Sequence, residues 1–129
     1  MKKNIYNSYL LCASSCIYLF AAAMIFAKNP RFAWLLLIVA VFSILYHKNF
    51  RNLGFKAFDW VFGLILGIYV YSLFGVKFDG YLFVFLIVLF GFRLTDHILF
   101  KTKRYSIFNY THSLWHVVTA VAVTLLFVL

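Results

Sequence analysis

The sequence predicts an all-α integral membrane protein, a bundle of about five transmembrane helices in a single domain covering residues 1–129. Hydrophobic residues make up 66% of the chain and charged residues only 12%, and the mean hydropathy is +0.97. A soluble domain is about half apolar and about a quarter charged. Water therefore cannot be the solvent for most of this surface. Five apolar segments approach the roughly 20 residues that a helix needs to cross the hydrocarbon core.

A tight polar turn separates the first two spans. The first span covers residues 6–27, and we expect no cleavable signal because its removal would discard a full-length span. Residues 28–31 read Lys-Asn-Pro-Arg, and Pro30 can end one helix and begin the next. The second span runs from residue 32 to residue 46 or 47, so it is short for a bilayer.

Three further spans follow. They cover residues 55–74, 81–100 and 109–129, with a loop at 75–80 and a basic loop after residue 100. Gly63 and Gly67 are four residues apart in the third span, a small-xxx-small pattern that is typical of close helix packing. We therefore expect this pair to lie at a helix contact.

The basic residues set the predicted orientation. A formal charge of +9 could indicate a nucleic-acid partner, but Lys and Arg mostly separate apolar segments, which indicates topology signals and attraction to anionic headgroups instead. The N-terminal side carries eight of them and the opposite side three. The eight are Lys2, Lys3, Lys48, Arg51, Lys56, Lys101, Lys103 and Arg104. This bias predicts a multi-pass protein with a cytoplasmic N-terminus and an external C-terminus.

Polar residues of three predicted spans fall in the same leaflet. His112 and His116 begin the last span and, being four residues apart, share one helix face. Ser43 and His47 end the second span with the same spacing, and Asp59 lies in the first turns of the third. The predicted topology places all five side chains on the cytoplasmic side. Ionisable groups inside spans usually face a protein interior or a wet cavity.

These residue types suit a catalytic metal. Three neutral imidazoles leave a tetrahedral zinc ion one open position, and a water there has its pKa lowered from about 15.7 towards about 7. Asp59 could accept the proton of that water or orient a ligand histidine. Ser43 could donate a hydrogen bond to the oxyanion that forms on an attacked carbonyl. The sequence thus predicts zinc on His47, His112 and His116, with attack by zinc-bound water.

Each residue also has a structural interpretation when it is taken alone. A histidine at the end of a span is commonly an interfacial residue. Asp59 could be an acidic residue that is favoured beside the N-terminal end of a helix dipole. Ser43 could bond its own backbone carbonyl. Their joint placement on one side of the membrane favours the metal site.

The motifs Ser43-x-x-x-His47, Asp59 and His112-Ser-Leu-Trp-His116 resemble the S-x-x-x-H, D, H-x-x-x-H pattern of the CREST superfamily of membrane hydrolases. That group includes alkaline ceramidases, post-GPI-attachment phospholipase-like proteins, and progestin and adipoQ receptors with bacterial hemolysin III relatives. The resemblance implies zinc on the three histidines, with the serine and the aspartate alongside. It also implies hydrolysis of an amide or ester bond in a membrane lipid.

The chain departs from that family in length. Members typically have seven spans, so two helices would be missing between Asp59 and the histidine pair. The acidic calcium site associated with ceramidases has no evident counterpart, because the N-terminal region holds no acid. A smaller bundle could also need a second copy of the chain, as a homo-oligomer, to close its pocket.

Other assignments remain open at this point. His97 is a rival third ligand or a proton shuttle, and Asp96 is expected to pair with Arg93 three residues earlier. The main rival function is a non-enzymatic, zinc-stabilised membrane receptor or sensor. A haem protein with histidine axial ligands and a transporter with His and Asp on an ion path are further alternatives.

Overall fold

The computed structural model describes residues 5–128, apart from the side chains of residues 75–79, 81 and 82. Helices account for nearly all of this range, and no strand occurs within it. The helices are α1 (Ser8–Ser15), α2 (Ile17–Phe26), α3 (Pro30–Lys48), α4 (Leu53–Lys101) and α5 (Tyr105–Val128). The predicted all-α class is confirmed.

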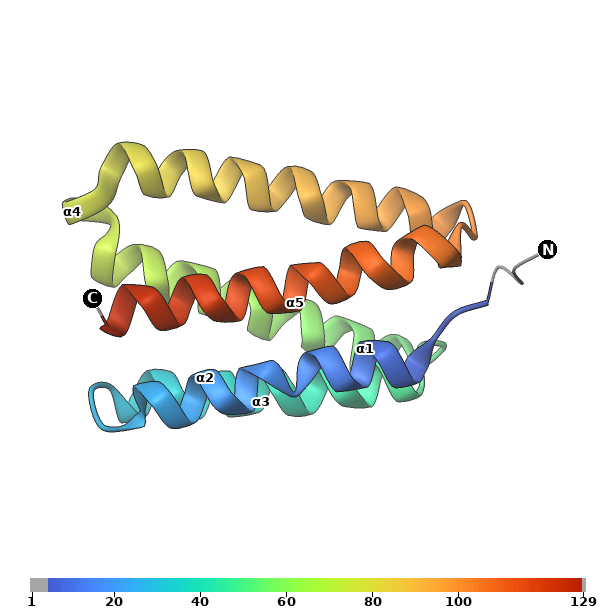
Figure 1. The fold of residues 1–129 in the computed structure, drawn as a ribbon, viewed down its shortest axis with the longest axis horizontal. Helices are drawn as coiled ribbons and strands as arrows, with labels where there is room; N and C mark the ends of the chain where they lie inside the picture. Colours follow the sequence, from blue (N-terminus) through green and yellow to red (C-terminus); the bar gives the residue numbers. More distant parts are fainter. Residues whose placement is uncertain (1–4, 129) are drawn as a thin grey trace.

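Five stretches of the described chain are long and apolar enough to cross a membrane, as predicted. α1 and α2 together form the first, Ser8–Phe26. α4 contains two, Leu53–Phe74 and Phe83–Lys101, and the chain reverses direction between them (Figure 1). We call these the first and second arms of α4. The backbone is helical through residues 75–80, where the sequence predicted a loop.

Asparagine caps fix where three helices begin. The side-chain oxygens of Asn7, Asn29 and Asn52 each accept a hydrogen bond from the backbone N–H three residues later, at 3.0 to 3.1 Å. Such a cap satisfies one of the backbone donors that a helix leaves unpaired at its N-terminus. Pro30 follows Asn29 at the first position of α3, where its missing N–H is not needed.

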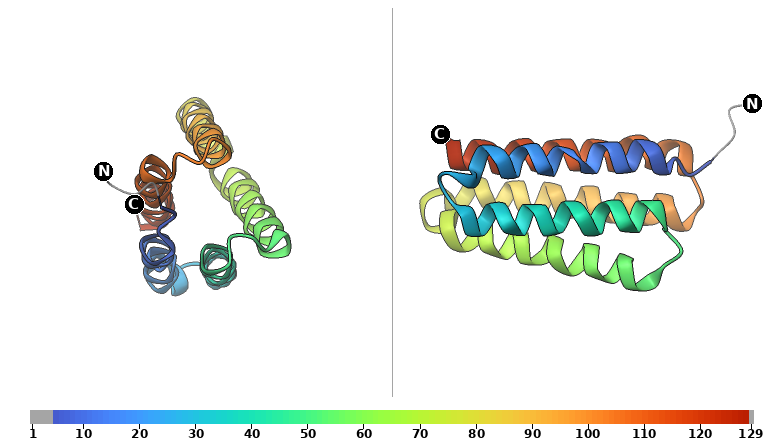
Figure 2. Two further views of the ribbon diagram at one scale, coloured as in Figure 1. Left: turned by 90° about the vertical axis from the view of Figure 1, so that its right-hand side faces the viewer. Right: turned by 90° about the horizontal axis from the view of Figure 1, so that it is seen from below.

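The helices form a ring in chain order, which is visible when the bundle is viewed along its length (Figure 2). α5 closes the ring by packing against α1 and α2, while α3 and α5 pack against α4. Small buried residues of α2 and α3 allow the tightest part of this packing: Ala21, Ala22, Ala33 and Ala40. The two arms of α4 bury the fewest residues of the five spans.

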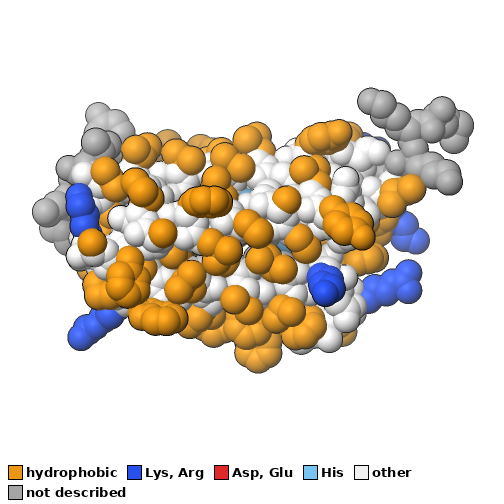
Figure 3. Space-filling model, turned by 60° about the horizontal axis from the view of Figure 1, so that its bottom comes forward, with side chains coloured by type: hydrophobic (Ala, Val, Ile, Leu, Met, Phe, Trp, Pro, Cys, Tyr) orange, Lys and Arg blue, Asp and Glu red, His pale blue; other side chains and the backbone are white. Residues whose placement is uncertain are grey.

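The outer surface suits a hydrocarbon environment. Hydrophobic side chains cover the flank of the bundle, and Lys and Arg gather towards its two ends (Figure 3). Large apolar residues such as Phe20 and Phe90 are more than 70% exposed. Exposed apolar surface on this scale is unfavourable in water, so the lateral surface fits a membrane.

Gly63 and Gly67 do not mediate helix packing, so that prediction is wrong. A Cβ atom built on either glycine would meet no atom within 4 Å. Both residues instead line a wide cavity between the arms of α4 and the rest of the bundle. The missing side chains therefore leave open space.

Candidate metal centre

Three histidines meet at the end of the bundle where α3 ends and α5 begins. His47 belongs to the last turn of α3, and His112 and His116 lie on successive turns of α5. All three are at most 2% exposed. One nitrogen from each lies within 4.8 Å of the other two, so the group could hold one metal ion. The predicted convergence of these histidines is confirmed.

Oxygen atoms hold the Nδ1 side of both α5 histidines. Asp96 Oδ2 lies 2.7 Å from His112 Nδ1, and because a carboxylate only accepts, Nδ1 carries the proton. Ser14 Oγ donates to the carbonyl of Leu11 at 3.0 Å, so it accepts from His116 Nδ1 at 2.8 Å. Both rings therefore present an unprotonated Nε2, the form that binds metal.

The third histidine is held by the N-terminal segment. Tyr6 Oη lies 2.7 Å from His47 Nδ1. Asn109 fixes this segment, because its Oδ1 accepts from the N–H of Asn7 at 3.0 Å and its Nδ2 donates to the carbonyl of Ile5 at 2.7 Å. Burial raises the pKa of the Tyr6 hydroxyl, so this group stays neutral beside the imidazole.

The remaining nitrogen of His47 shows that the group fits a metal. His47 Nε2 is the single buried side-chain nitrogen or oxygen of the described residues that has no hydrogen-bond partner. A buried polar atom without a partner costs about 1–3 kcal/mol, which coordination of a cation would offset. Ligating histidines usually donate their other ring N–H to an oxygen, the arrangement seen on His112 and His116.

Ser43 and Asp59 lie beside the histidines on two further elements. Ser43 is buried in α3, with its Oγ 3.4 Å from His116 Nε2 and 2.9 Å from Ser15 Oγ. Asp59 is buried on the first arm of α4. Together with His112 and His116, these two residues line the wide cavity. The structure thus brings the predicted site residues to one end of the bundle.

Arg93 contacts several residues of the site, although the sequence predicted only a local ion pair for it. Its Nη2 lies 3.6 Å from Asp59 Oδ2, and its guanidinium carbon lies 4.8 Å and 5.7 Å from the ring centres of Trp60 and Trp115. Its Nη1 comes within 3.1 Å of His112 Nδ1. His112 Nδ1 already donates to Asp96. Arg93 Nη1 and His112 Nδ1 are therefore two donors that lie close together without a hydrogen bond between them.

Asp96 has different partners from those that the sequence predicted. The expected pair with Arg93 is wrong, because Asp96 accepts from Thr111 Oγ1 at 2.6 Å and from His112, while Arg93 pairs with Asp59. His97 lies outside the group of three that could hold a metal, with its ring 6.3 Å from that of Trp60. Its role as a rival third ligand is therefore excluded in this arrangement.

Three supporting residues, Tyr6, Ser14 and Asp96, had no predicted contact with a histidine. Asp96 lies near the end of the predicted span 81–100, and His112 lies near the start of the next span, 109–129, so their closeness in sequence and depth was a usable signal. A hydroxyl such as that of Tyr6 or Ser14 occurs often in apolar helices and carries no comparable signal.

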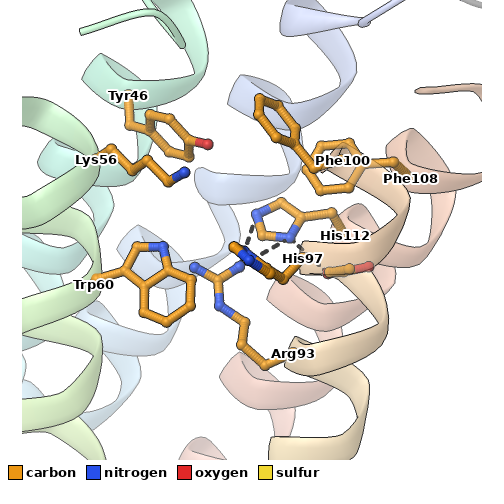
Figure 4. A pocket seen from close by; sticks show the side chains of 9 residues that line it. Tyr46, Lys56, Trp60, Arg93, His97, Phe100, Phe108 and His112 are labelled. Carbon is orange, nitrogen blue, oxygen red and sulfur yellow. Dashed lines mark hydrogen bonds and ion pairs between the residues drawn. The ribbon is translucent and has the colours of Figure 1, made fainter. Parts of the chain in front are cut away.

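Two hollows adjoin the histidines. The wide cavity has a volume of about 840 Å³ and is lined mainly by apolar residues of the α4 arms, with contributions from α3 and α5. A small hollow of about 20 Å³ is lined by Lys56, Arg93 and His112 among others (Figure 4). The two share Trp60, Arg93, His97 and His112. His112 lines both hollows and His116 lines the wide one, so the histidine group adjoins the apolar cavity and reaches the small hollow through His112.

Comparison of the chain with protein-family models, with curated proteins and with solved structures gave no match. The resemblance to the CREST superfamily therefore rests on the short motifs around Ser43, Asp59 and the histidines. The function has to be argued from the geometry of the site.

We expect the purified chain to bind one divalent metal ion, and His112→Ala to abolish that binding. Asp96→Asn should weaken metal affinity about 10- to 100-fold, because the amide orients His112 less well than the carboxylate. His97→Ala is the matched control and should leave affinity unchanged. The measurement is competition against a chelator of known affinity. Equal affinities for wild type and Asp96→Asn would contradict the assigned support.

Proposed function

We propose that the protein is a zinc-dependent intramembrane hydrolase that cleaves an amide or ester bond of a membrane lipid. The observation that carries this proposal is a group of three buried histidines, two of which, His112 and His116, line a large apolar cavity. Three imidazoles with a fourth open position are a common ligand set of catalytic zinc, whereas structural zinc sites are usually closed by four protein ligands.

Zinc is the metal that best suits the donors present. The group offers three neutral nitrogens and no thiolate, because Cys12 and Cys16 lie outside it. Imidazole ligands suit zinc, copper, iron and nickel, and zinc among these favours tetrahedral sites without redox chemistry. When bound, it supplies Lewis acidity that lowers the pKa of water and polarises a carbonyl.

Asp59 is the proposed general base. Its carboxylate lines the cavity beside the histidines and is held by Arg93 at 3.6 Å, too far for a short hydrogen bond. The carboxylate therefore keeps lone pairs available to take a proton from the attacking water. The same group can then return the proton to the departing amine or alkoxide.

Ser43 is the proposed oxyanion donor. Ser15 Oγ donates to the carbonyl of Leu11 at 2.8 Å, so it can accept the proton of the Ser43 hydroxyl at 2.9 Å in the absence of substrate. Rotation of the Ser43 hydroxyl would aim this hydrogen at an acyl oxygen as negative charge develops there. Burial at this position strengthens such a hydrogen bond.

The wide cavity is the proposed site for an acyl chain. Its volume of about 840 Å³ lies within the range of about 300–1,000 Å³ that is typical of ligand pockets. Buried apolar residues such as Leu66 and Val123 line its inner wall, while Leu64 and Phe90 line it and are also widely exposed on the flank. This combination supports lateral entry of a lipid tail between the arms of α4.

The orientation in the membrane follows from charge. The histidine group lies at the end of the bundle that holds the α3–α4 and α4–α5 turns. Those turns are rich in Lys and Arg, so we place this end at the cytoplasmic face.

The CREST resemblance implies the same ligand set, and it supports a lipid substrate.

Hydrolysis is tested by release of fatty acid from a panel of ester- and amide-linked membrane lipids. Asp59→Asn should lower the rate about 10²–10⁴-fold and Ser43→Ala about 10²–10³-fold, with metal content unchanged in both. Ser72→Ala is the matched serine control, because Ser72 is exposed and its hydroxyl bonds only the carbonyl of Tyr69. Retained zinc without turnover across the panel would instead support a zinc-stabilised receptor or sensor.

The acyl-chain assignment is tested at Gly67. A leucine there would project into open space, so Gly67→Leu should fold normally and occupy part of the cavity. We expect it to shift the preference of the enzyme towards shorter acyl chains. Gly91→Leu is the control, because Gly91 also has open space around it but does not line the cavity. An identical chain-length profile for wild type and Gly67→Leu would contradict this use of the cavity.

A further inference from the structure

The small hollow beside the histidines is lined by cations from both arms of α4. Lys56 of the first arm and Arg93 of the second reach towards the same space, and His97 lies beside Arg93 on the side of His112 (Figure 4). Tyr46 of α3 lies next to Lys56 and also lines the hollow (Figure 4). Arg93 also lines the wide cavity, so this cationic hollow adjoins the proposed site for the acyl chain.

The positive charge in the hollow is only partly neutralised. Both oxygens of Asp96 accept short hydrogen bonds, from Thr111 at 2.6 Å and from His112 at 2.7 Å. Asp59 is the one carboxylate of the described residues within ion-pair distance of Arg93, and its 3.6 Å separation exceeds a hydrogen bond. Lys56 Nζ lies 5.5 Å from the centre of the Phe100 ring, so its neighbour is an aromatic ring and not an acid.

A metal ion in the histidine group would increase this excess. A divalent cation and the two basic side chains would face only two carboxylates. An uncompensated positive charge at a buried site favours an anionic ligand. Two tryptophan rings hold the Arg93 guanidinium in place, which limits its movement towards solvent.

Phosphate is the anion that this arrangement suits. Arg donates through a planar fork to phosphate oxygens, and Lys binds phosphate as a point charge. Basic pockets between membrane helices on the cytoplasmic side are typical sites for anionic lipid headgroups. The volume of about 20 Å³ admits one water-sized group, so a phosphate would lie at the mouth and insert one oxygen.

We infer that Lys56 and Arg93 form a headgroup subsite, and that the lipid bound in the adjoining cavity carries a phosphate group. This inference rests on the proposed function, because it names the substrate class of the same site. It assigns the acyl chain to the apolar cavity and the phosphate to the cationic hollow. A neutral lipid such as a ceramide would supply no anion to either cation, and Arg93 would keep only its 3.6 Å ion pair with Asp59.

Binding to the full chain in detergent tests the subsite without relying on turnover. The probes are dioctanoyl phosphatidic acid, dioctanoylglycerol with the same chains and no phosphate, and inorganic phosphate. Native mass spectrometry measures the relative affinities. We expect wild type to bind the phosphatidic acid at least about fivefold more tightly than dioctanoylglycerol, since one basic contact contributes roughly this factor.

Lys56→Gln is the main variant, because Lys56 is only half-buried and its replacement should not prevent folding. It should lower affinity for the phosphatidic acid about fivefold and leave that for dioctanoylglycerol unchanged. Lys101→Gln removes an exposed charge at the same end of the bundle and should change neither affinity. Arg93→Gln should reduce the phosphatidic acid preference further.

Three outcomes would overturn the subsite. The first is equal affinity of wild type for the two lipids. The second is an equal loss of affinity for the phosphatidic acid in Lys56→Gln and Lys101→Gln. The third is Lys56-dependent binding of inorganic phosphate without any advantage of the phosphatidic acid, which would assign the hollow to free phosphate. A preference for phosphatidic acid over dioctanoylglycerol without release of octanoate would support the subsite and contradict the proposed hydrolase activity. Release of octanoate without that preference would support the hydrolase activity and contradict the subsite.

Discussion

The burial of three imidazoles away from water is the constraint on which the rest of the site depends. A buried polar nitrogen needs a partner, and each of these rings has two nitrogens to satisfy. On the Nδ1 side the protein supplies the hydroxyls of Tyr6 and Ser14 and the carboxylate of Asp96. On the other side His47 Nε2 is left without a partner. His116 Nε2 and His112 Nε2 have only long contacts, with Ser43 Oγ at 3.4 Å and Arg93 Nη1 at 3.5 Å, so a shared ligand could bind all three rings on this side.

The connections between helices create this arrangement. Turns at the end of α3 and before α5 bring the two histidine-bearing helix ends together, and Asn109 ties the N-terminal segment to the same place. The reversal within α4 returns its second arm to this end of the bundle, which positions Arg93 and Asp96 (Figure 1). Both arms joined by this reversal line the apolar cavity, from Asp59 to Tyr71 and from Phe85 to His97. One topological feature therefore places both the polar support and the apolar chamber.

Hydropathy was sufficient to predict the spans and the all-α class, because a bilayer imposes a length and a composition on every helix. The i, i+4 spacing of His112 and His116, with the alternation of the spans, was sufficient to predict which end they share with His47. Side-chain partners across helices depend on the rotation of each helix about its axis, which hydropathy does not determine. For that reason Asp96 was paired with the wrong residue, and Gly63 and Gly67 were assigned to a helix contact rather than a cavity wall.

The proposed function requires that the three histidines coordinate one zinc ion through nitrogen. X-ray absorption at the zinc edge of the zinc-loaded protein tests this most directly. We expect the zinc ion to have three imidazole nitrogens at about 2.0–2.1 Å and one oxygen as its ligands, without sulfur. Sulfur scattering at about 2.3 Å would instead indicate Cys12 and Cys16 as ligands, and it would contradict the claim. Failure of the folded protein to retain zinc would contradict it equally.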